Sequence, residues 1–571
     1  MMRKTKKNEQ RKAHILTLSV LLKCFLVRLP SSTTAFVSHR PVVITQLPSI
    51  IHRSPIAFTS LAASISGNTA TDESSTAHDD KQKPPSARLV AVRAILEESQ
   101  RRRRGKSNTS SSSFSGLPPL DKLESSLSSL AETQQLSVRD RSFARLLVAT
   151  CVRRMGQIDK VLAQCQTRGT AQSKEQQQQR HNQRPDDLWI QAVLRIGAVQ
   201  ILFLQTPSHA AVKETVDLLR LAPVHIPPAK IKFVNAVLRR LTREGKTMLE
   251  QTLVTDNAAP WLVQEWTQAW GTQATLAIIE AAMQESPRCL TVKGSPGTVE
   301  HDNKLKLLAD EFDECQILPQ GSMMILEPPP GKVSGWPLYE EGVWWLQDVS
   351  ATLPALALRN ALPPAPSNEE DDKPVRVVDL CAAPGGKTAQ LCSFGYDVTA
   401  VEISKRRSRR LQENVDRLGL NCNVIVADGS EWTPDEAFQG VLLDAPCTAT
   451  GTGSKRPDVL RKDDNYGDLL ETQYKLLCHA ADNILAPGGI LVYATCSLLR
   501  QESEDQVDKF LSRDSPVRME TLPFDDGEIP GLEECVDERG WLRVIPGSRP
   551  SRSTGLSHVD GFFVARLRRI A

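Results

Sequence analysis

The stretch from Val377 to Thr388, VVDLCAAPGGKT, constrains the fold more than any other part of this chain. Apolar residues around one acid precede Pro-Gly-Gly-Lys-Thr, which is the pattern of a β-strand that runs into a tight loop and then a helix. Such a turn directs backbone N–H groups from the positive end of a helix dipole toward an anionic or polar ligand. The sequence therefore predicts a ligand-binding strand–loop–helix unit at this point.

Strand and helix patterns alternate regularly over residues 375–571. Because regular alternation is typical of a mostly parallel, doubly wound sheet, we predict a Rossmann-like α/β domain. Strands are predicted at 375–380, 397–402, 423–428, 440–444, 490–495, 541–545 and 561–567. Helices are predicted from the loop to about 393 and at 404–418, 464–485 and 501–512. Ligands of such sheets lie beyond the strand carboxyl ends, at or near which stand Asp379, Glu402, Asp428, Asp444 and Cys496.

The glycine-rich loop has two interpretations. Gly386-Lys387-Thr388 matches the end of a P-loop, but Cys381 stands where the first glycine is needed and Pro384 removes an amide that should face phosphate. S-adenosylmethionine has no phosphate and needs only a close backbone approach at the glycines. It also needs an acid for its ribose at the end of the next strand, where Glu402 lies, and Asp428 can accept from adenine. The second interpretation is favoured, and Lys387 is then expected near the cofactor's carboxylate or a strand-end acid.

Two cysteines follow apolar strands and can face the same cleft: Cys447 in LLDAPCTATGTGSKRPD and Cys496 in YATCSLLRQESED. Carbon 5 of cytosine is a poor nucleophile. A thiolate that adds to carbon 6 makes carbon 5 enamine-like and able to attack a methyl sulfonium. An acid near the nucleophile, Asp444, can stabilise the adduct at the ring nitrogen. Afterwards a base must remove the carbon-5 proton and release the thiol, a step that the second cysteine can assist.

Residues 86–246 read as a helical bundle and carry 27 Lys/Arg against 13 Asp/Glu, a net charge of +14. Such a basic module suggests a polyanion partner, most simply nucleic acid. The segments RDRSFARLL, LRIGAVQILFL, TPSHAAVKETV and FVNAVLRRL, in this order, resemble the NusB-like RNA-binding domain.

DAPC together with TCS resembles the Nop/Sun family of RNA cytosine-5 methyltransferases, and the chain from about residue 86 resembles its RsmB-type branch (ribosomal small-subunit methyltransferase B). The resemblance implies that Cys496 is the nucleophile and that Cys447 assists product release. It implies rRNA, of the small subunit, as the substrate. It implies cofactor contacts at Cys381, Ala382, Ala383, Pro384, Gly385, Gly386 and Lys387, with Glu402, Asp428 and Asp444. The chain departs from the family in QESED, where Glu-Glu-Asn is more common, and in two insertions.

Three alternatives to this function stay open beside the P-loop NTPase. In DNA cytosine-5 methyltransferases the Pro-Cys cysteine, here Cys447, is the nucleophile; the second cysteine and the helical module favour RNA. A tRNA substrate is the second alternative. The third is a ribosome-assembly factor that binds RNA without turnover, against which the acids and both cysteines argue.

The N-terminal region has the composition of a targeting sequence. Residues 1–71 contain ten Lys/Arg and one acid, Glu9, and an apolar run at Ile15–Val27. Because SSTTAFVSHRP around Phe36 resembles the cleavage context of two-part plastid presequences, we expect a plastid address, with the mitochondrion as the alternative. No stable membrane association is expected, since the apolar run is short. No metal site is expected, since no Cys/His cluster has zinc spacing. The protein is expected to be a monomer. The expected organisation is a presequence (1–71), a linker (72–85), a NusB-like domain (86–246) with disordered insertions at 101–119 and 166–186, a mixed α/β segment (255–360), an acidic linker (361–374) and the methyltransferase domain (375–571).

Overall fold

The computed structural model describes residues 86–105, 130, 133, 135–166, 184–364, 374–547 and 559–570, and residues 82–571 form one compact unit. Several expectations lie outside the described residues. These are the presequence and linker, residues 106–119 of the first insertion, 167–183 of the second and 365–373 of the acidic linker.

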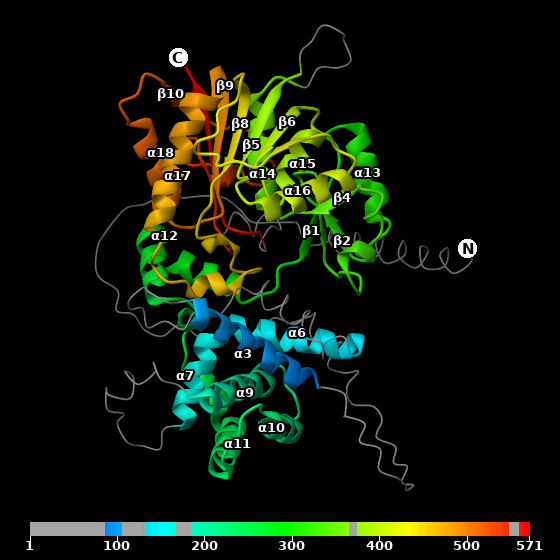
Figure 1. The fold of residues 1–571 in the computed structure, drawn as a ribbon, viewed down its shortest axis with the longest axis vertical. Helices are drawn as coiled ribbons and strands as arrows, with labels where there is room; N and C mark the ends of the chain where they lie inside the picture. Colours follow the sequence, from blue (N-terminus) through cyan, green and yellow to red (C-terminus); the bar gives the residue numbers. More distant parts are fainter. Residues whose placement is uncertain are drawn as a thin grey trace, which may run out of the picture. The chain divides into compact units, whose positions relative to one another are not determined.

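The basic N-terminal part is helical, as predicted. Its helices, in blue to green in Figure 1, bury their apolar faces in one core that includes Val90, Leu147, Ile158, Val193 and Leu238. They are α3 (Ala87–Gly105), α6 (Val138–Arg153), α7 (Met155–Gln166), α9 (Pro185–Leu202), α10 (Ser208–Asp217) and α11 (Pro228–Glu250).

The expected break at residue 101 is wrong, because α3 continues through the arginine run to Gly105. Arginine is a good helix former, whereas glycine is not. Among the described residues, no helix is both long and apolar enough to cross a membrane.

A small mixed segment precedes the large sheet. Its strands form a four-stranded antiparallel sheet in the order β2-β3-β1-β4. Helix α12 has a non-helical residue at Gly271, and α14 begins at an aspartate cap, since Asp348 accepts from the Ser350 amide at 2.9 Å. The elements are α12 (Pro260–Ala282), β1 (Arg288–Val292), α13 (Val299–Ala309), β2 (Cys315–Ile317), β3 (Ser322–Ile325), β4 (Trp344–Leu346) and α14 (Val349–Ala361).

The large sheet is the predicted doubly wound, mostly parallel one. Its order is β10-β12-β9-β8-β5-β6-β7, with β11 paired to β12. The strands from β9 to β7 along this order are parallel, and β12 adds antiparallel to β9. The strands are β5 (Arg376–Leu380), β6 (Asp397–Val401), β7 (Asn423–Ile425), β8 (Phe438–Asp444), β9 (Leu485–Thr495), β10 (Met519–Thr521), β11 (Leu542–Val544) and β12 (Phe562–Arg569).

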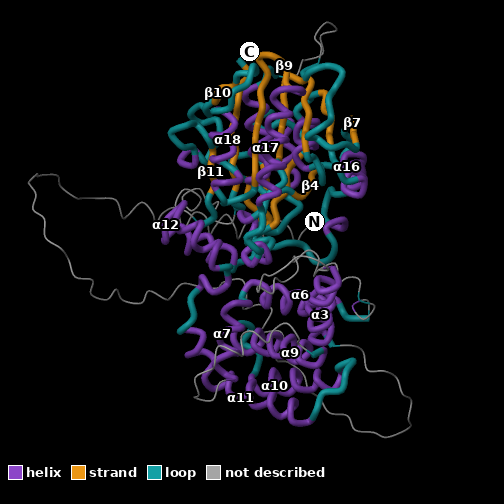
Figure 2. The backbone as a smooth tube through the Cα atoms, turned by 60° about the vertical axis from the view of Figure 1, so that its left-hand side comes forward, coloured by secondary structure: helices purple, strands orange, loops and turns teal. Residues whose placement is uncertain are grey.

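Helices cover both faces of this sheet because its central strands are apolar on both sides. In β8, Leu442 packs on one face, whereas Val441 and Leu443 pack on the other. The first face carries α14, α15 (Gly386–Ser393) and α16 (Lys405–Arg417). The second carries α17 (Gly467–His479) and α18 (Glu504–Leu511), which lie side by side in Figures 1 and 2.

Element bounds differ from the prediction at four places. Strand β7 ends at Ile425, and the last helix begins at Glu504 rather than 501. The helix expected at 464–485 begins at Gly467 and changes from α-helix to π-helix at Ala480, ending at Ile484. Strand β9 begins at Leu485, so the Pro-Gly-Gly turn lies inside it as a register shift against β8. Strand β10, which is only three residues long, was not predicted.

Candidate active site

Cys447 and Cys496 come together in space although 49 residues separate them. Cys447 follows β8 and Cys496 follows β9, and these neighbouring parallel strands deliver both residues to one edge of the sheet. The two Sγ atoms lie 3.5 Å apart, within hydrogen-bonding distance for sulfur. The Cys496 contact and burial raise the pKa of the Cys447 thiol well above its usual value, and the Glu502 charge adds to this. Cys447 is therefore held protonated.

A buried carboxylate, Glu502, joins the two cysteine loops. Its Oε1 accepts from the Thr448 amide at 2.9 Å and from Gln473 Nε2 at 3.0 Å. Its Oε2 accepts from the hydroxyls of Thr448 and Ser497. Thr448 follows Cys447 and Ser497 follows Cys496, so one fully buried side chain fixes the position of both cysteines.

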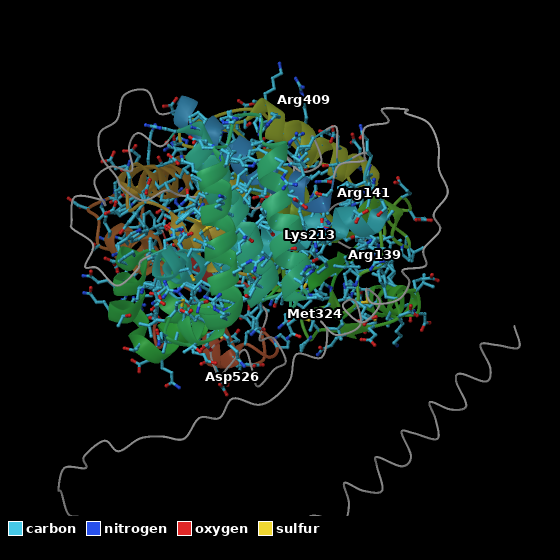
Figure 3. The ribbon with its side chains drawn as sticks, turned by 90° about the horizontal axis from the view of Figure 1, so that it is seen from below. Arg139, Arg141, Lys213, Met324, Arg409 and Asp526 are labelled. Atoms are coloured by element: carbon cyan, nitrogen blue, oxygen red, sulfur yellow. The ribbon has the colours of Figure 1, made fainter. Side chains whose placement is uncertain are left out.

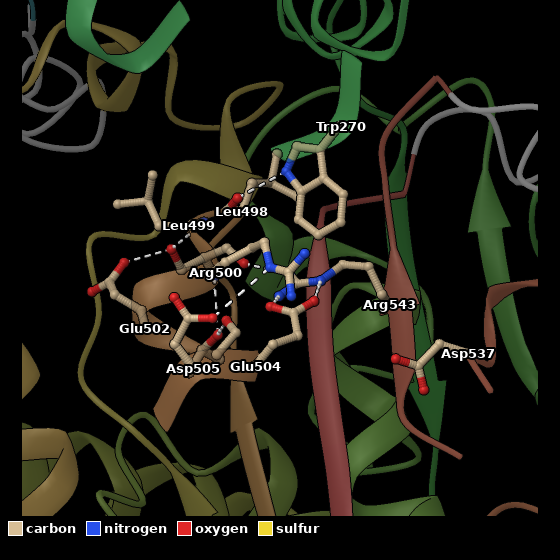
Figure 4. Close-up of polar contacts among 12 residues, drawn as sticks. Trp270, Leu498, Leu499, Arg500, Glu502, Glu504, Asp505, Asp537 and Arg543 are labelled. Carbon is tan, nitrogen blue, oxygen red and sulfur yellow. Dashed lines mark hydrogen bonds and ion pairs between the residues drawn. The ribbon is translucent and has the colours of Figure 1, made fainter. Parts of the chain in front are cut away.

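The loop after Cys496 has two further supports. Arg543 donates to the Ser497 carbonyl at 2.6 Å and forms a bidentate ion pair with Glu504, at 2.7 and 3.0 Å. Figure 4 shows its guanidinium between the Glu504 carboxylate and the Trp270 ring, and Trp270 Nε1 donates to the Leu498 carbonyl at 3.0 Å. Each of these groups is buried or half-buried, so the loop after Cys496 is held by contacts that water does not weaken.

The two glycines of the glycine-rich loop pack closely against protein side chains. Gly385 has φ +101°, and a Cβ there would lie 3.1 Å from Leu411 Cγ. A Cβ on Gly386 would lie 3.3 Å from Gln347 Cδ. Below the loop, Asp379 accepts from Thr388 Oγ1 at 2.6 Å, while its buried Oδ1 has no hydrogen-bond partner among the described residues. Burial raises the pKa of Asp379 to about 7, against the opposing effects of Thr388 and Lys387.

Cys381, in the same loop, has a positive φ of 63°, and burial raises the pKa of its thiol to about 12. It is therefore a neutral thiol and differs in chemistry from the cysteine pair. Ala382 and Ala383 continue the loop: Ala382 N donates to the Val401 carbonyl at 3.1 Å, and the Ala383–Pro384 peptide bond is cis.

Glu402 directly follows the next strand, β6, and Asp428 comes three residues after the strand beyond it, β7. Glu402 is buried; its Oε1 accepts from Arg407 at 2.7 and 3.0 Å and from the Ser404 amide, and its Oε2 accepts from the Ala383 amide at 3.4 Å. Asp428 is exposed, and hydrogen bonds from Ser430 lower the pKa of its carboxyl. Between them in sequence, the Ile403 side chain is 61% exposed, an apolar surface beside two acids.

Lys387 reaches a strand-end acid, as predicted. Its Nζ donates to Asp444 Oδ2 at 2.8 Å and lies 5.4 Å from the centre of the Phe562 ring. Burial alone would lower the pKa of Lys387, but Asp444 outweighs this and raises it, with smaller effects from Asp379 and Cys496. A second cation, half-buried Lys462, donates to the Thr448 carbonyl and interacts electrostatically with both paired cysteines.

Most of the predicted residues converge on one edge of the sheet, whereas Asp428 lies three residues beyond the short β7. Four residues of the candidate site were not predicted from the sequence. Glu502 stands in the QESED departure from the family pattern, which was the one available signal. Ile403, Lys462 and Arg543 had none, because their roles depend on side-chain contacts made across the fold.

Comparison with known proteins agrees with this geometry. Residues 364–568 match the family described as 16S rRNA methyltransferase RsmB/F, and residues 86–243 match the NusB family. The chain is 35% identical over 357 residues to the ribosomal RNA small subunit methyltransferase B of Salmonella paratyphi B, covering 60% of this chain and 79% of that one. The protein of the same name from Salmonella newport is 36% identical, with the same coverage.

A solved structure shows a similar fold over most of the chain. The crystal structure of PH0851 aligns with a TM-score of 0.57 at 21% identity, covering 84% of this chain and 98% of that one. The family predicted from the cysteine motifs is confirmed. The chain belongs to the RsmB/F family of rRNA methyltransferases, with a NusB domain ahead of the methyltransferase domain.

Proposed function

We propose that this enzyme transfers a methyl group from S-adenosylmethionine to carbon 5 of a cytosine in small-subunit rRNA, through a covalent adduct with Cys496. The observation that carries the proposal is the cysteine pair, whose Sγ atoms lie 3.5 Å apart at the carboxyl edge of the sheet. The thiolate is the reactive form of cysteine, so the attacking sulfur must lose its proton, while the other thiol can stay protonated beside it. The resemblance of the TCS and DAPC motifs to the Nop/Sun family assigns the attack to Cys496 and the assisting role to Cys447.

The charges around the pair fit this assignment. The ammonium groups of Lys387 and Lys462, both half-buried, interact electrostatically with Cys496, and Lys462 interacts with Cys447 as well. They attract the negative charge that Cys496 carries when it attacks. The Cys447 S–H can donate to the same sulfur and holds it in place.

The reaction proceeds in two stages. The Cys496 thiolate adds to carbon 6 of cytosine, forming an Sγ–C6 bond and leaving carbon 5 electron-rich, so that carbon 5 takes the methyl group as that group's bond to the sulfonium sulfur breaks. A base then takes the carbon-5 proton, the electron pair of that C–H bond restores the C5–C6 double bond, and the Sγ–C6 bond breaks. Cys447, beside the departing sulfur, assists this release. Asp444 Oδ1 makes no hydrogen bond with the described residues and can accept from the ring nitrogen once that nitrogen carries a proton in the adduct.

The cofactor fits the residues of the glycine-rich loop. S-adenosylmethionine supplies a methyl group on a positively charged sulfonium. Side chains at Gly385 or Gly386 would crowd Leu411 or Gln347 and disturb the close backbone approach that the cofactor needs. Glu402 Oε2, with one weak partner, is the acceptor for the ribose hydroxyls, and exposed Ile403 offers an apolar face to adenine. Asp428 accepts from the adenine amino group. Since Lys387 is bound to Asp444, it is not a phosphate ligand.

Cysteine replacement tests the assignment. Cys496→Ala should abolish methyl transfer to rRNA, and Cys447→Ala should accumulate a protein–RNA adduct that survives a denaturing gel. Cys315→Ala, in the small sheet, is the matched control and should keep full activity. Full activity of Cys496→Ala would reject the nucleophile assignment. Loss of transfer in Cys447→Ala with an adduct in Cys496→Ala would indicate the DNA-type arrangement.

The non-catalytic alternative, a ribosome-assembly factor, has its own test. The proposal expects calorimetry to detect S-adenosylmethionine binding that is weakened at least tenfold by Glu402→Ala. A chain that binds rRNA but no cofactor would support the alternative. Bisulfite sequencing of rRNA and tRNA from cells with and without the gene would identify the modified cytosine.

A plastid location is part of the proposal and rests on the composition of residues 1–71 and on the motif around Phe36. These residues fused to a fluorescent protein should direct it to the plastid, and Phe36→Ala should redirect or retain it outside. Mitochondrial import of the unchanged fusion would instead support the alternative address.

A further inference from the structure

We propose that the first two turns of α16 form a second RNA-binding surface, which holds the phosphate backbone of the substrate at the carboxyl edge of the large sheet. The surface, here called the α16 patch, consists of Lys405, Arg406, Arg409 and Arg410, all exposed. The inference deepens the proposed function and rests on it, because it takes RNA as the substrate.

The α16 patch has no partner within the described part of the chain. None of its four side chains forms an ion pair or a hydrogen bond there. Arg407, between them in sequence, is different because it pairs with buried Glu402. In Figure 3 the labelled Arg409 side chain points away from the ribbon.

This placement of cations opposes the stability of the helix. A cation near a helix N-terminus meets the positive end of the dipole, which is unfavourable within the first turn, where Lys405 and Arg406 lie. Lys405 and Arg409, like Arg406 and Arg410, are also like charges four residues apart, which destabilises a helix further. Three helices, α9, α13 and α18, have two acids in the first turn, whereas α16 begins with Lys405-Arg406-Arg407 and has none. A polyanion partner gives the unfavourable cluster a function.

The position of the α16 patch suits RNA that reaches the cysteines. Helix α16 starts four residues after β6 ends, at the same sheet edge as Cys447 and Cys496. Strands β6 and β9 are separated by two strands in the sheet order, hence by three spacings, about 15 Å in all. This length corresponds to about four phosphates along one strand of a duplex. One RNA segment can therefore contact the patch while its target base lies at the cysteines.

Salt-dependent binding tests the proposal. The probe is unmodified small-subunit rRNA transcribed in vitro, bound to the full chain. For Arg409→Gln/Arg410→Gln, the slope of log affinity against log salt concentration should become shallower by about 1.4–1.8, for two lost phosphate contacts. The affinity should fall at least several-fold at low salt, and Arg409→Glu/Arg410→Glu should bind more weakly still.

A matched control exists at the opposite edge. Arg518→Gln/Arg568→Gln removes two exposed cations, and Arg568 pairs in register with Ile490, which lies six residues before Cys496 along β9. This variant should keep the wild-type slope. Because the glutamines relieve the repulsion between like charges on this helix, the thermal midpoint of Arg409→Gln/Arg410→Gln should be unchanged or higher, so weaker binding would not reflect misfolding.

Three outcomes separate the inference from the proposed function. An unchanged slope and affinity in the α16 variants, with active wild-type enzyme, would overturn the inference and indicate an acidic protein as the partner. Equal losses in the α16 variants and the control would also overturn it, since no local surface would then be involved. If the wild type binds this rRNA without methylating it, the proposed function fails, while a shallower slope in the α16 variants alone would still support the patch.

Discussion

Glu502 is the residue whose replacement should show how the cysteine pair is held. Glu502→Ala leaves the buried Thr448 amide and Gln473 Nε2 without their carboxylate acceptor, at a cost of about 1–3 kcal/mol for each unsatisfied group. Both cysteine loops then lose a shared anchor. We expect kcat to fall at least a hundredfold while the affinity for S-adenosylmethionine stays the same.

Glu502→Gln removes the negative charge of this side chain but can keep its hydrogen bonds to both cysteine loops. The amide oxygen keeps the two N–H donors, and the Thr448 and Ser497 hydroxyls can turn to accept from the new amino group, so most activity should remain. Because the Glu502 charge raises the pKa of Cys447, its removal should shift alkylation of Cys447 toward lower pH. Mass spectrometry resolved by site measures this shift. An unchanged alkylation profile would mean that Glu502 acts through geometry alone.

Asp379 should make stability depend on pH. Its pKa is about 7 in the folded protein and 3.8 ordinarily, so the folded state binds the proton more tightly. Its contribution to the free energy of unfolding is fully present below pH 4 and is lost as the pH rises through 7, at about 1.4 kcal/mol per pH unit. Asp379→Asn, which can still accept from Thr388, should abolish this loss. Chemical unfolding at pH 5 and pH 8 measures it, and equal pH dependence in both proteins would contradict the assignment.

Single residues could be predicted from the sequence where chemistry requires a particular type. The cysteines, the glycines of the loop and the strand-end acids are of this kind, and Lys387 was placed near an acid. Arg407, Arg543 and Lys462 were not predicted. An arginine or lysine at a given position says nothing about the carboxylate or carbonyl that it meets 5 to 50 residues away.

At the scale of elements, periodicity predicted the central strands and the helices between them, because both faces of β5, β8 and β9 are apolar. It failed where side chains end an element early. Asp428 forms a turn with Ser430 and lies beyond the end of β7, and Glu502 turns inward, so that α18 starts two residues later. The short β10 carries too few residues for a pattern.

Lys455 connects the loop between Cys447 and α17 to the small mixed segment through ion pairs. Lys455 Nζ contacts Asp348, the cap of α14, and Asp560, just before β12, at 3.0 Å for the latter. Burial raises the pKa of Asp560 to about 6, with a further increase from Asp348. Lys455→Met would leave two carboxylates close together without their cation.

We expect Lys455→Met to lower the free energy of unfolding by about 3–5 kcal/mol at pH 8. The loss should be smaller at pH 5, where Asp560 takes up a proton. Lys475→Met, which breaks an exposed pair with Glu431, is the control and should cost less than about 1 kcal/mol. Urea unfolding at the two pH values measures both, and a pH-independent loss would show that packing, not charge, holds the loop.

At the scale of the whole molecule, the sequence predicts that the N-terminal module is helical. It does not predict where this module contacts the rest of the chain. Gly156, early in α7, lies against the chain that leads into α12: a Cβ there would sit 1.7 Å from the Asp256 carbonyl oxygen. Beside it, Asn257 accepts from the Gln157 amide at 3.1 Å and donates to the Gln157 side chain at 2.8 Å. Nothing in the periodicity of either segment predicts that they meet, because the contact joins positions 100 residues apart.

Gly156→Ala should therefore loosen this junction without harming the cysteine pair. A Cβ cannot fit unless backbone moves, so alanine, which elsewhere in a helix stabilises, should destabilise here by more than about 1 kcal/mol. Gly467→Ala, at the start of α17 with open space around it, is the matched control and should be neutral or stabilising. If the helical module binds rRNA, as we expect from its charge, KM for rRNA should rise while kcat changes little, because the module would be held less firmly. A lower kcat with unchanged KM would instead mean that Gly156 acts on the active site directly.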